Sequence, residues 1–298
     1  MGANLKDVRE RIKSVISTQQ ITKAMKMVSA AKLRRAQDAI VRMRPYALKL
    51  NDMLVHILSN ADESATGSFA VSREVKKVLI VVVTSNRGLA GAFNTNIIKE
   101  ARALMAGKYA DQFQAGNVFV LCIGKKGYDY FRKSMPASNI VKDHVALFSD
   151  LSFDAIVDVP SMIMDLFSNE TYDAVEVCYS RFKNAAVQYA EAAQYLPVPK
   201  MKPNKSEGRE TKADYIFEPN EEDLLKELIP SILQTQFHRY LLDTHASEHG
   251  ARMTAMDKAT ENADELLKEL RITYNKARQE AITSEISEIV GGAAALNG

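Results

Sequence analysis

The chain has 298 residues, enough for two structural units, and its 46% hydrophobic and 26% charged residues exclude a globally disordered protein. Its two cysteines form no CxxC pair and cannot build a disulfide framework, which indicates a reducing compartment; no stretch approaches the ~18 apolar residues of a membrane span. The formal net charge of +2 hides an asymmetry, because residues 1–50 carry twelve Lys/Arg against three Asp/Glu, whereas residues 221–298 carry eight against fourteen. The two ends are therefore electrostatically complementary.

Residues 1–60 are expected to form one long helix. They contain no glycine after Gly2 and a single proline, Pro45, where a kink is expected because the apolar pattern continues in phase beyond it. Apolar residues recur in steps of four and three, the heptad spacing of a coiled coil, at Leu5, Val8, Ile12, Val15, Ala36, Ile40, Met43, Ala47, Leu50, Leu54 and Ile57. The pattern weakens between these two groups. A helix of this length would measure ~85 Å.

Residues 75–220 are expected to form an α/β domain. Continuous apolar runs predict buried strands at Val78–Thr84, Val118–Ile123 and Ala174–Tyr179, and a later strand at Ala186–Leu196. Helical patterns fall between them at about Thr95–Met105, Lys125–Lys133 and Phe153–Phe167. Alternation of strand and helix predicts a parallel sheet with crossover helices. Residues 197–214 are polar and rich in proline and lysine, and are expected to form a mobile loop.

Residues 221–298 are expected to form a second long helix, with its regular part from Ser231 to Leu296, ~100 Å in length. Its heptad row comprises Leu242, Ala246, His249, Met253, Met256, Thr260, Ala263, Leu267, Leu270, Tyr274, Ala277 and Ala281, and then shifts by one residue. Neither long helix can bury such a row inside an ordinary domain. The fold class expected is therefore α/β plus a long antiparallel coiled coil: the terminal helices pair as a shaft, and a Rossmann-like α/β domain is inserted between them.

Reactive groups give little indication of catalysis. The turn Gly88–Gly91 follows the first strand but matches no phosphate-binding fingerprint, so a structural turn is favoured. His245 and His249 lie four residues apart, without a third metal ligand, and packing is the favoured role. No catalytic residues, metal ligands or cofactor are expected.

Two surface features suggest partners. The basic residues Lys23, Lys26, Lys32, Arg34 and Arg35 lie in a stretch that is almost free of acidic residues, which favours an acidic partner surface. The stretch Ile282–Leu296 is apolar and rich in small residues, which suggests insertion into a collar made by a partner.

Several segments resemble one family. Ile21–Leu33 resembles the N-terminal helix of the gamma subunit of F-type ATP synthases, and residues 282–295 resemble its C-terminal signature, I-T-x-E-x-x-E-x-x-x-G-A-x-A. Arg44–Tyr46, Thr84–Leu89 and Arg252–Met256 also resemble segments of that family. The chain departs from the family pattern at two places: Ala90 stands where many relatives have cysteine, and residues 197–214 are longer or more divergent than the usual loop. No chloroplast-type cysteine pair is present, so regulation by thiol oxidation is not expected.

The resemblance implies a non-catalytic central-stalk rotor subunit, one copy per complex, that transmits torque between the c-ring and the catalytic hexamer and regulates ATPase activity and proton flow. Its partners would be the alpha and beta subunits, the epsilon subunit and the c-ring. It implies contacts to a beta or alpha subunit through Lys23, Met25, Lys26, Arg278 and Gln279, and an apolar bearing formed by Ile282, Ile286, Ile289, Ala293 and Leu296. Nucleic acid is not an expected partner. The membrane would be reached only through the complex, at the cytoplasmic face of a bacterial inner membrane.

Two other readings remain open on the residues alone. One is a nucleotide-binding α/β enzyme with helical arms for oligomerisation, which predicts that residues 75–220 bind nucleotide. The other is a basic coiled-coil protein that binds nucleic acid through residues 1–60, which predicts steeply salt-dependent binding. Neither explains the small, apolar C-terminal stretch.

Overall fold

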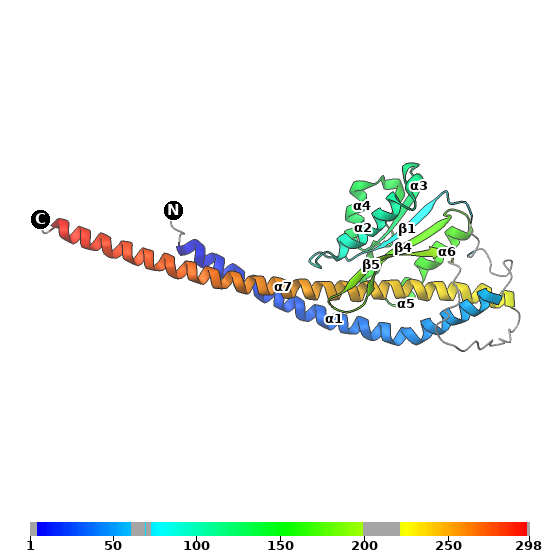
Figure 1. The fold of residues 1–298 in the computed structure, drawn as a ribbon, viewed down its shortest axis with the longest axis horizontal. Helices are drawn as coiled ribbons and strands as arrows, with labels where there is room; N and C mark the ends of the chain where they lie inside the picture. The colour runs from blue at the N-terminus through cyan, green and yellow to red at the C-terminus, as the bar shows by residue number, and fades with distance from the viewer. Residues whose placement is uncertain (1–4, 61–68, 70–72, 199–220, 297–298) are drawn as a thin grey trace. The chain divides into compact units, whose positions relative to one another are not determined.

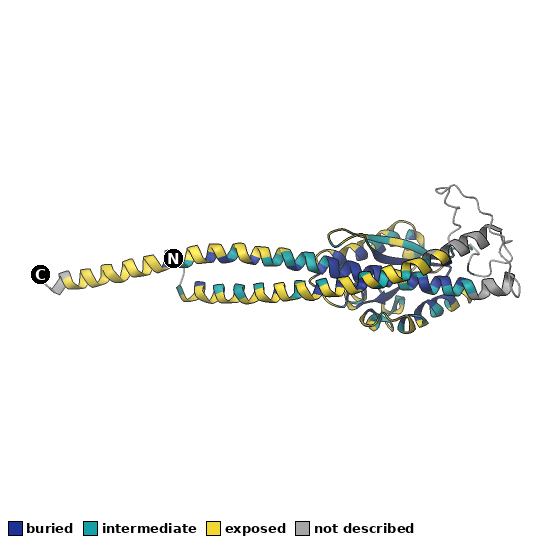
Figure 2. Cartoon of the chain, turned by 90° about the horizontal axis from the view of Figure 1, so that it is seen from below, coloured by how far each residue is buried: buried dark blue, intermediate teal, exposed yellow. Residues whose placement is uncertain are grey.

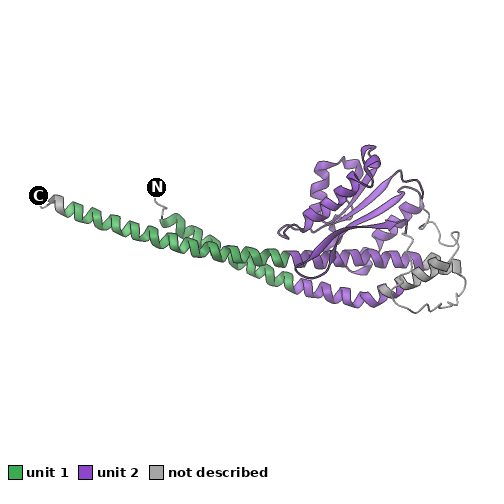
Figure 3. Ribbon diagram, in the orientation of Figure 1, with its two compact units in different colours: residues 1–30, 252–298 green, residues 31–251 purple. Residues whose placement is uncertain are grey.

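The computed structural model describes residues 5–60, 69, 73–198 and 221–296. The chain divides into two compact units (Figure 3), one made of residues 1–30 and 252–298 and the other of residues 31–251. We call them the terminal unit and the sheet unit. The expected mobile loop at 197–214 falls almost entirely outside the described residues.

Two long helices carry the terminal parts of the chain (Figure 1): α1 spans Leu5–Asn60 and α7 spans Glu221–Leu296. Pro45 lies inside α1, as expected. The second long helix starts at Glu221, within the range 221–298 expected for it, and its regular part begins ten residues before the expected Ser231, because α7 continues through Pro230. A proline inside a helix removes one backbone hydrogen bond, a loss that a helix of 76 residues can absorb. In the described residues, no helix combines the length and hydropathy required to span a bilayer.

The sheet unit contains a five-stranded sheet in the order β3-β2-β1-β4-β5. The first four strands are mutually parallel, and β5 runs antiparallel to β4. The strands are β1 Val78–Val83, β2 Val118–Ile123, β3 Ile140–Val141, β4 Ala174–Phe182 and β5 Gln188–Leu196. The helices between them are α2 Phe93–Ala106, α3 Ala110–Gln114, α4 Lys125–Ser134, α5 Phe153–Ile156 and α6 Asp158–Ser168, with 3₁₀ turns at Ala137–Asn139 and Val145–Ser149.

The four expected strands are present: β1 and β2 are continuous apolar runs and β4 begins with one, whereas β5 mixes polar and apolar residues. Strand β3 was not expected, because two residues carry no periodicity that a sequence pattern can reveal. The helix expected over Phe153–Phe167 is two helices, α5 and α6. Pro160 lies in the first turn of α6 and has no N–H to donate to the preceding turn, so the break there has a local cause.

The sheet is covered on both faces. On one face, alternate residues of β1 such as Ile80 and Val82 pack with Ile97 of α2 and Phe131 of α4. On the other face, Leu79 and Val81 belong to a second cluster that includes α6 and the first half of α7. This alternation follows from the period of two in a strand, and burial of both faces explains why the runs are continuously apolar.

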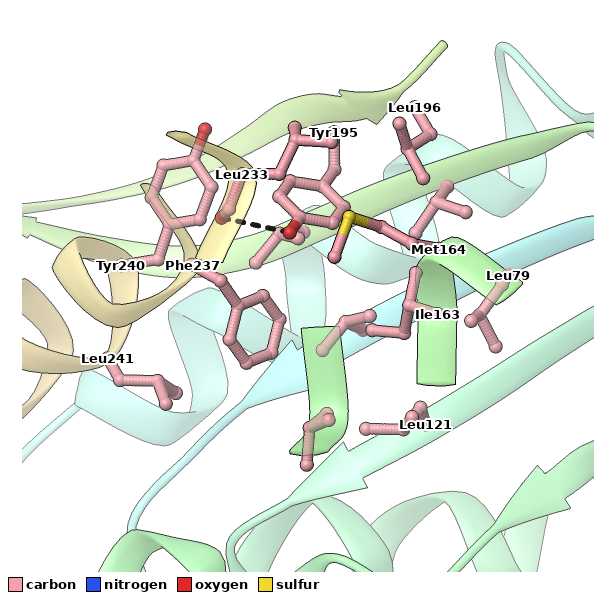
Figure 4. Packing of buried hydrophobic residues seen from close by; sticks show 14 of the residues in the cluster. Leu79, Leu121, Ile163, Met164, Tyr195, Leu196, Leu233, Phe237, Tyr240 and Leu241 are labelled. Carbon is pink, nitrogen blue, oxygen red and sulfur yellow. Dashed lines mark hydrogen bonds between the residues drawn. The ribbon is translucent and has the colours of Figure 1, made fainter. Parts of the chain in front are cut away.

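Tyr195 joins β5 to α7 within that second cluster (Figure 4). Its ring is 1% exposed and its hydroxyl donates a hydrogen bond of 2.9 Å to the backbone oxygen of Leu233. We expect Tyr195→Phe to lower the free energy of unfolding by about 1 kcal/mol, because it removes one buried hydrogen bond and little volume. Urea titration followed by circular dichroism measures the change. Tyr46→Phe, at a side chain that is 56% exposed, is the control and should change nothing measurable; equal effects would contradict the prediction.

Within the terminal unit, α1 and α7 lie antiparallel. Three hydrogen-bonded pairs fix the register: Gln19 with Asp264, Thr22 with Thr260 at 2.8 Å, and Lys26 with Asp257. Residues on the predicted heptad row of α7 in this unit, including Met256, Ala263, Leu267, Leu270 and Ala277, are buried. Ala281, the last position of that row, is exposed instead. The reason is the register, which places Leu5 opposite about residue 278, so α1 has no described residue left to cover it.

Candidate functional site

His245 and His249 pack against each other on α7. His249 is 5% exposed, and its Nε2 atom lies 3.1 Å from Nε2 of His245. Burial, together with the charge of Lys32, lowers the pKa of His245 to about 4, so the ring is neutral near pH 7. In the part of the chain that the structure describes, no group of three or more His, Cys, Asp or Glu side chains could hold a metal ion.

The turn after β1 is held by its own polar groups. Asn94 Oδ1 accepts a hydrogen bond of 2.9 Å from the backbone N–H of Ser85, and Ser85 Oγ donates to the backbone oxygen of Arg87 at 2.7 Å. Leu89 has a φ of 65° and Gly91 a φ of 57°, so the chain turns sharply before α2 begins. These contacts agree with the structural role expected for Gly88–Gly91.

The basic face of α1 in the terminal unit is only partly free. Lys23 is exposed and Met25 is half-buried. Lys26 makes an ion pair with Asp257 of α7, and the two side chains remain 41% and 45% exposed. The expected contact role of Lys26 toward a partner therefore competes with a bond inside the chain, a pairing that the complementary charge of the two ends predicts in general terms.

The last described turns of α7 are exposed (Figure 2), and they carry a row of large apolar side chains. Ile282, Ile286 and Ile289 are 47%, 55% and 66% exposed, and Ala293 is also exposed. The side chain of Leu296 lies outside the described residues. Steps of four and three place these residues along one side of α7. They lie beyond Leu5, the first described residue of α1, so no described part of α1 lies opposite them.

Arg278 and Gln279 are exposed at the start of this segment. Arg278 lies just before the apolar row and opposite the first described residue of α1. The structure therefore brings the expected contact pair and the expected apolar bearing together on one stretch of α7, residues 278–293.

In the terminal unit, the described part of α1 exposes three further large apolar residues whose exposure was not expected from the sequence. Ile21, Met27 and Val28 are 57%, 62% and 57% exposed in the terminal unit. A signal for them was present, because they are large apolar residues outside the heptad positions of a helix whose other faces are basic. The two helices of the terminal unit thus both present apolar surface to solvent.

These features define a class of protein. Long helices that expose apolar rows and free cations act through contacts with other macromolecules, since such surface is stabilised only when a partner covers it. The described site is that of a structural subunit of a larger assembly.

Comparison with known proteins identifies the assembly. The family model described as ATP synthase matches residues 4–296. The ATP synthase gamma chain of Cytophaga hutchinsonii is 54% identical over 99% of both chains, and that of Flavobacterium psychrophilum is 51% identical over 99% of this chain and 100% of its own. In fold, the chain is similar to a chain of the Euglena gracilis mitochondrial ATP synthase, described as OSCP/F1/c-ring in rotational state 3, with a TM-score of 0.64, 21% identity and coverage of 98% and 94%.

The chain therefore belongs to the ATP synthase gamma-chain family. It is a non-catalytic subunit of an F-type ATP synthase and part of its central stalk, as the sequence resemblance implied. The two other readings, an α/β enzyme and a nucleic-acid-binding coiled coil, are set aside by identity that extends over the whole length of the chain.

Proposed function

We propose that α1 and α7 pair as an antiparallel coiled coil that transmits torque between a c-ring and a catalytic hexamer of alpha and beta subunits. The observation that carries this proposal is the cross-helix register in the terminal unit, where three polar pairs bind segments more than 230 residues apart in sequence. Apolar residues of α7 pack along the same seam. Two helices bonded in register resist sliding past one another, which a torque carrier requires.

The proposed organisation has three parts. Residues 1–60 and 221–298 form the coiled coil, and residues 75–220 form a foot that binds the c-ring and the epsilon subunit. The strand order β3-β2-β1-β4 with helices on both faces supports calling the foot Rossmann-like. One copy serves each complex, and the subunit lies at the cytoplasmic face of a bacterial inner membrane, bound to it only through its partners.

The proposed contacts with the hexamer are of two kinds. Lys23, Met25 and Lys26 face an acidic loop of a beta subunit, and Arg278 with Gln279 engages a beta or alpha loop. Ile282, Ile286, Ile289, Ala293 and Leu296 turn inside an apolar sleeve. Full burial of an Ile side chain is worth ~1.5–3 kcal/mol. About half of each of the three Ile side chains is still exposed, so covering them would contribute about 1 kcal/mol each.

The energy scale decides how these contacts share the load. One elementary charge crossing ~100 mV yields about 2.3 kcal/mol, so several ions per ATP put of order 10 kcal/mol through the subunit. An exposed ion pair is worth ~0.2–1 kcal/mol. No single Lys or Arg can carry the torque, and packing together with many distributed charges must share it.

This reasoning predicts a modest effect for Arg278→Ala. We expect ATP-driven rotation and ATP synthesis to continue, with coupling or binding lowered by a few-fold at most, because a single exposed charge contributes ~0.2–1 kcal/mol. Synthesis in inverted membrane vesicles and rotation of single complexes measure the two effects. Arg271→Ala, also exposed on α7, is the matched control. Complete loss of synthesis in a folded and assembled Arg278→Ala complex would show that load is concentrated on one residue.

Co-purification from membranes tests the proposed function as a whole. A tag on this chain should recover alpha, beta and epsilon subunits and the c-ring in one complex that hydrolyses ATP. Replacing Ile282, Ile286 and Ile289 together by Ser should leave the foot contacts intact and weaken retention of the alpha and beta subunits. Recovery of the chain without any of these subunits would overturn the proposal.

A further inference from the structure

A cleft in the sheet unit is not used by the proposed torque function. It has a volume of about 540 Å³ and is lined by residues of α2, α3 and α4, together with Met135 after α4. Its volume falls in the range of ~300–1,000 Å³ typical of small-molecule sites. The cleft lies within a single unit, and all of its lining residues are described.

One wall of the cleft is cationic. Lys99 and Arg102, three residues apart on α2, share one side of that helix and are exposed. Within the described chain, neither forms an ion pair, although other cations of the sheet unit do, such as Lys108 with Glu176. Among the described lining residues none is acidic. The positive charge of this wall is therefore not neutralised inside the unit.

The other lining residues include aromatic and apolar side chains. Phe113 of α3 is 42% exposed, although it is a large apolar side chain, and Tyr130 of α4 and Met135, the residue after α4, also line the cleft. A half-exposed phenyl ring beside a cleft provides a surface on which a planar ring can stack. The two groups of lining residues differ in chemistry, and a ligand that fits both must carry an anionic group at one end and a ring at the other.

We propose that this cleft binds a small aromatic anion of the class that a nucleoside monophosphate represents, with its phosphate between Lys99 and Arg102 and its ring against Phe113 and Tyr130. Apart from Lys99 near the middle of α2 and Phe113 of α3, the lining residues lie toward the C-terminal ends of α2 and α4, where the helix dipoles are negative. Helix ends therefore do not attract the anion, and the two side-chain cations must supply all of the attraction. Binding depends on Arg102 and Lys99 for that reason.

The composition of the chain allows a site-specific test. The protein contains no tryptophan, so Phe113→Trp places its single indole at the cleft. Phe153→Trp is the matched control, because Phe153 is 43% exposed on α5 and does not line the cleft. We expect AMP added to the purified full-length Phe113→Trp chain to change the tryptophan fluorescence along a saturable curve, and the Phe153→Trp chain to show no saturable change.

Charge variants complete the test. In the Phe113→Trp chain, Arg102→Ala and Lys99→Ala should each weaken AMP binding at least about tenfold, as loss of a charge-assisted contact does. Lys133→Ala removes a cation of α4 that does not line the cleft and should have little effect. Adenosine and inorganic phosphate, tested alone, should each bind at least about tenfold more weakly than AMP.

Three results would overturn the proposal: equal responses of the two tryptophan chains, equal losses in Lys133→Ala and Arg102→Ala, or tighter binding of an acidic peptide with one Phe than of AMP. The last would assign the cleft to a protein segment instead. The proposal does not depend on torque transmission, since the full-length chain is tested without its partners.

Discussion

Gly124→Ala is expected to cost the sheet unit at least about 3 kcal/mol of unfolding free energy. Gly124 lies between β2 and α4 with a φ of 94° and a ψ of 139°, a conformation that residues with a Cβ rarely adopt. A Cβ added there would lie 1.9 Å from the backbone oxygen of Thr84 and 2.6 Å from its carbonyl carbon. Backbone strain of this kind costs ~1–3 kcal/mol, and the clash with the backbone of Thr84, the residue after β1, adds to it.

The clash is hard to relieve because Thr84 is fixed on both sides. Its backbone N–H donates to the oxygen of Ile123 at 2.8 Å, and its hydroxyl accepts a hydrogen bond of 2.8 Å from the N–H of Gly127. Moving Thr84 away would break the contact that starts α4 behind β2. A Cβ at Gly127 would also meet the Thr84 hydroxyl at 2.9 Å, so two glycines serve the same close approach.

Gly116→Ala is the control that measures the backbone strain of a positive φ without a steric clash. Gly116 also has a positive φ, of 74°, but a Cβ there would meet nothing within 4 Å. Gly116→Ala should therefore lower the free energy of unfolding by only about 1 kcal/mol, the cost of the backbone strain alone. Urea titrations of both variants, followed by circular dichroism, give the comparison. If Gly124→Ala loses no more stability than Gly116→Ala, then the backbone of β1 is free to move and the close approach is not a constraint.

The sequence predicted the sheet and the two long helices because their signals are local. Val78–Val83 is a continuous apolar run, and the heptad row on α7 is repeated over many turns. Gly124 could not be assigned a role in the same way. Its constraint comes from Thr84, forty residues earlier, and no pattern around either residue reveals that the two backbones meet.

The candidate site was predictable to the extent that its residues stand out by composition. The apolar C-terminal stretch and the basic run on α1 contrast with their surroundings. The middle of the α1 seam was not predictable, because its buried residues there are polar: Thr22 and Ser29 are 8% and 2% exposed, and Thr22 hydrogen-bonds to Thr260 across the pair. A polar residue in a heptad position looks like an interruption until its partner, 238 residues later, is known.

A second large effect is expected from a buried carboxylate of α7 in the sheet unit. Asp243 is 7% exposed, and its nearest cation is Arg239, with 3.9 Å between the Nε atom and a carboxylate oxygen. Burial raises the pKa of Asp243 to about 6, while Arg239, Arg181 and Arg44 oppose the rise and Glu191 reinforces it. The arginines therefore do not compensate for the loss of hydration.

The direction in which stability changes with pH follows from the number of protons bound by the folded and the unfolded chain. An unfolded Asp has a pKa near 3.9, so between about pH 4 and pH 6 the folded chain binds more protons at this site than the unfolded chain does. The contribution of Asp243 to stability is therefore fully present below pH 4 and is lost as the pH rises to about 6. His245, whose pKa is lowered to about 4, changes stability in the opposite direction, since its neutral form is favoured by folding.

Asp243→Asn should therefore stabilise the protein at pH 8 by up to about 3 kcal/mol, since it removes the cost of burying the charge, at ~1.4 kcal/mol per pKa unit. At pH 4 the difference should fall close to zero, because the wild-type carboxyl is then largely neutral; His245 is present in both chains and cancels from the comparison. Urea titrations at pH 4 and pH 8 measure both differences, with Asp154→Asn, at an exposed position, as the control. Destabilisation of Asp243→Asn at pH 8 would mean that Arg239, Arg181 and Arg44 together outweigh burial, and that the carboxylate is held charged in the folded protein.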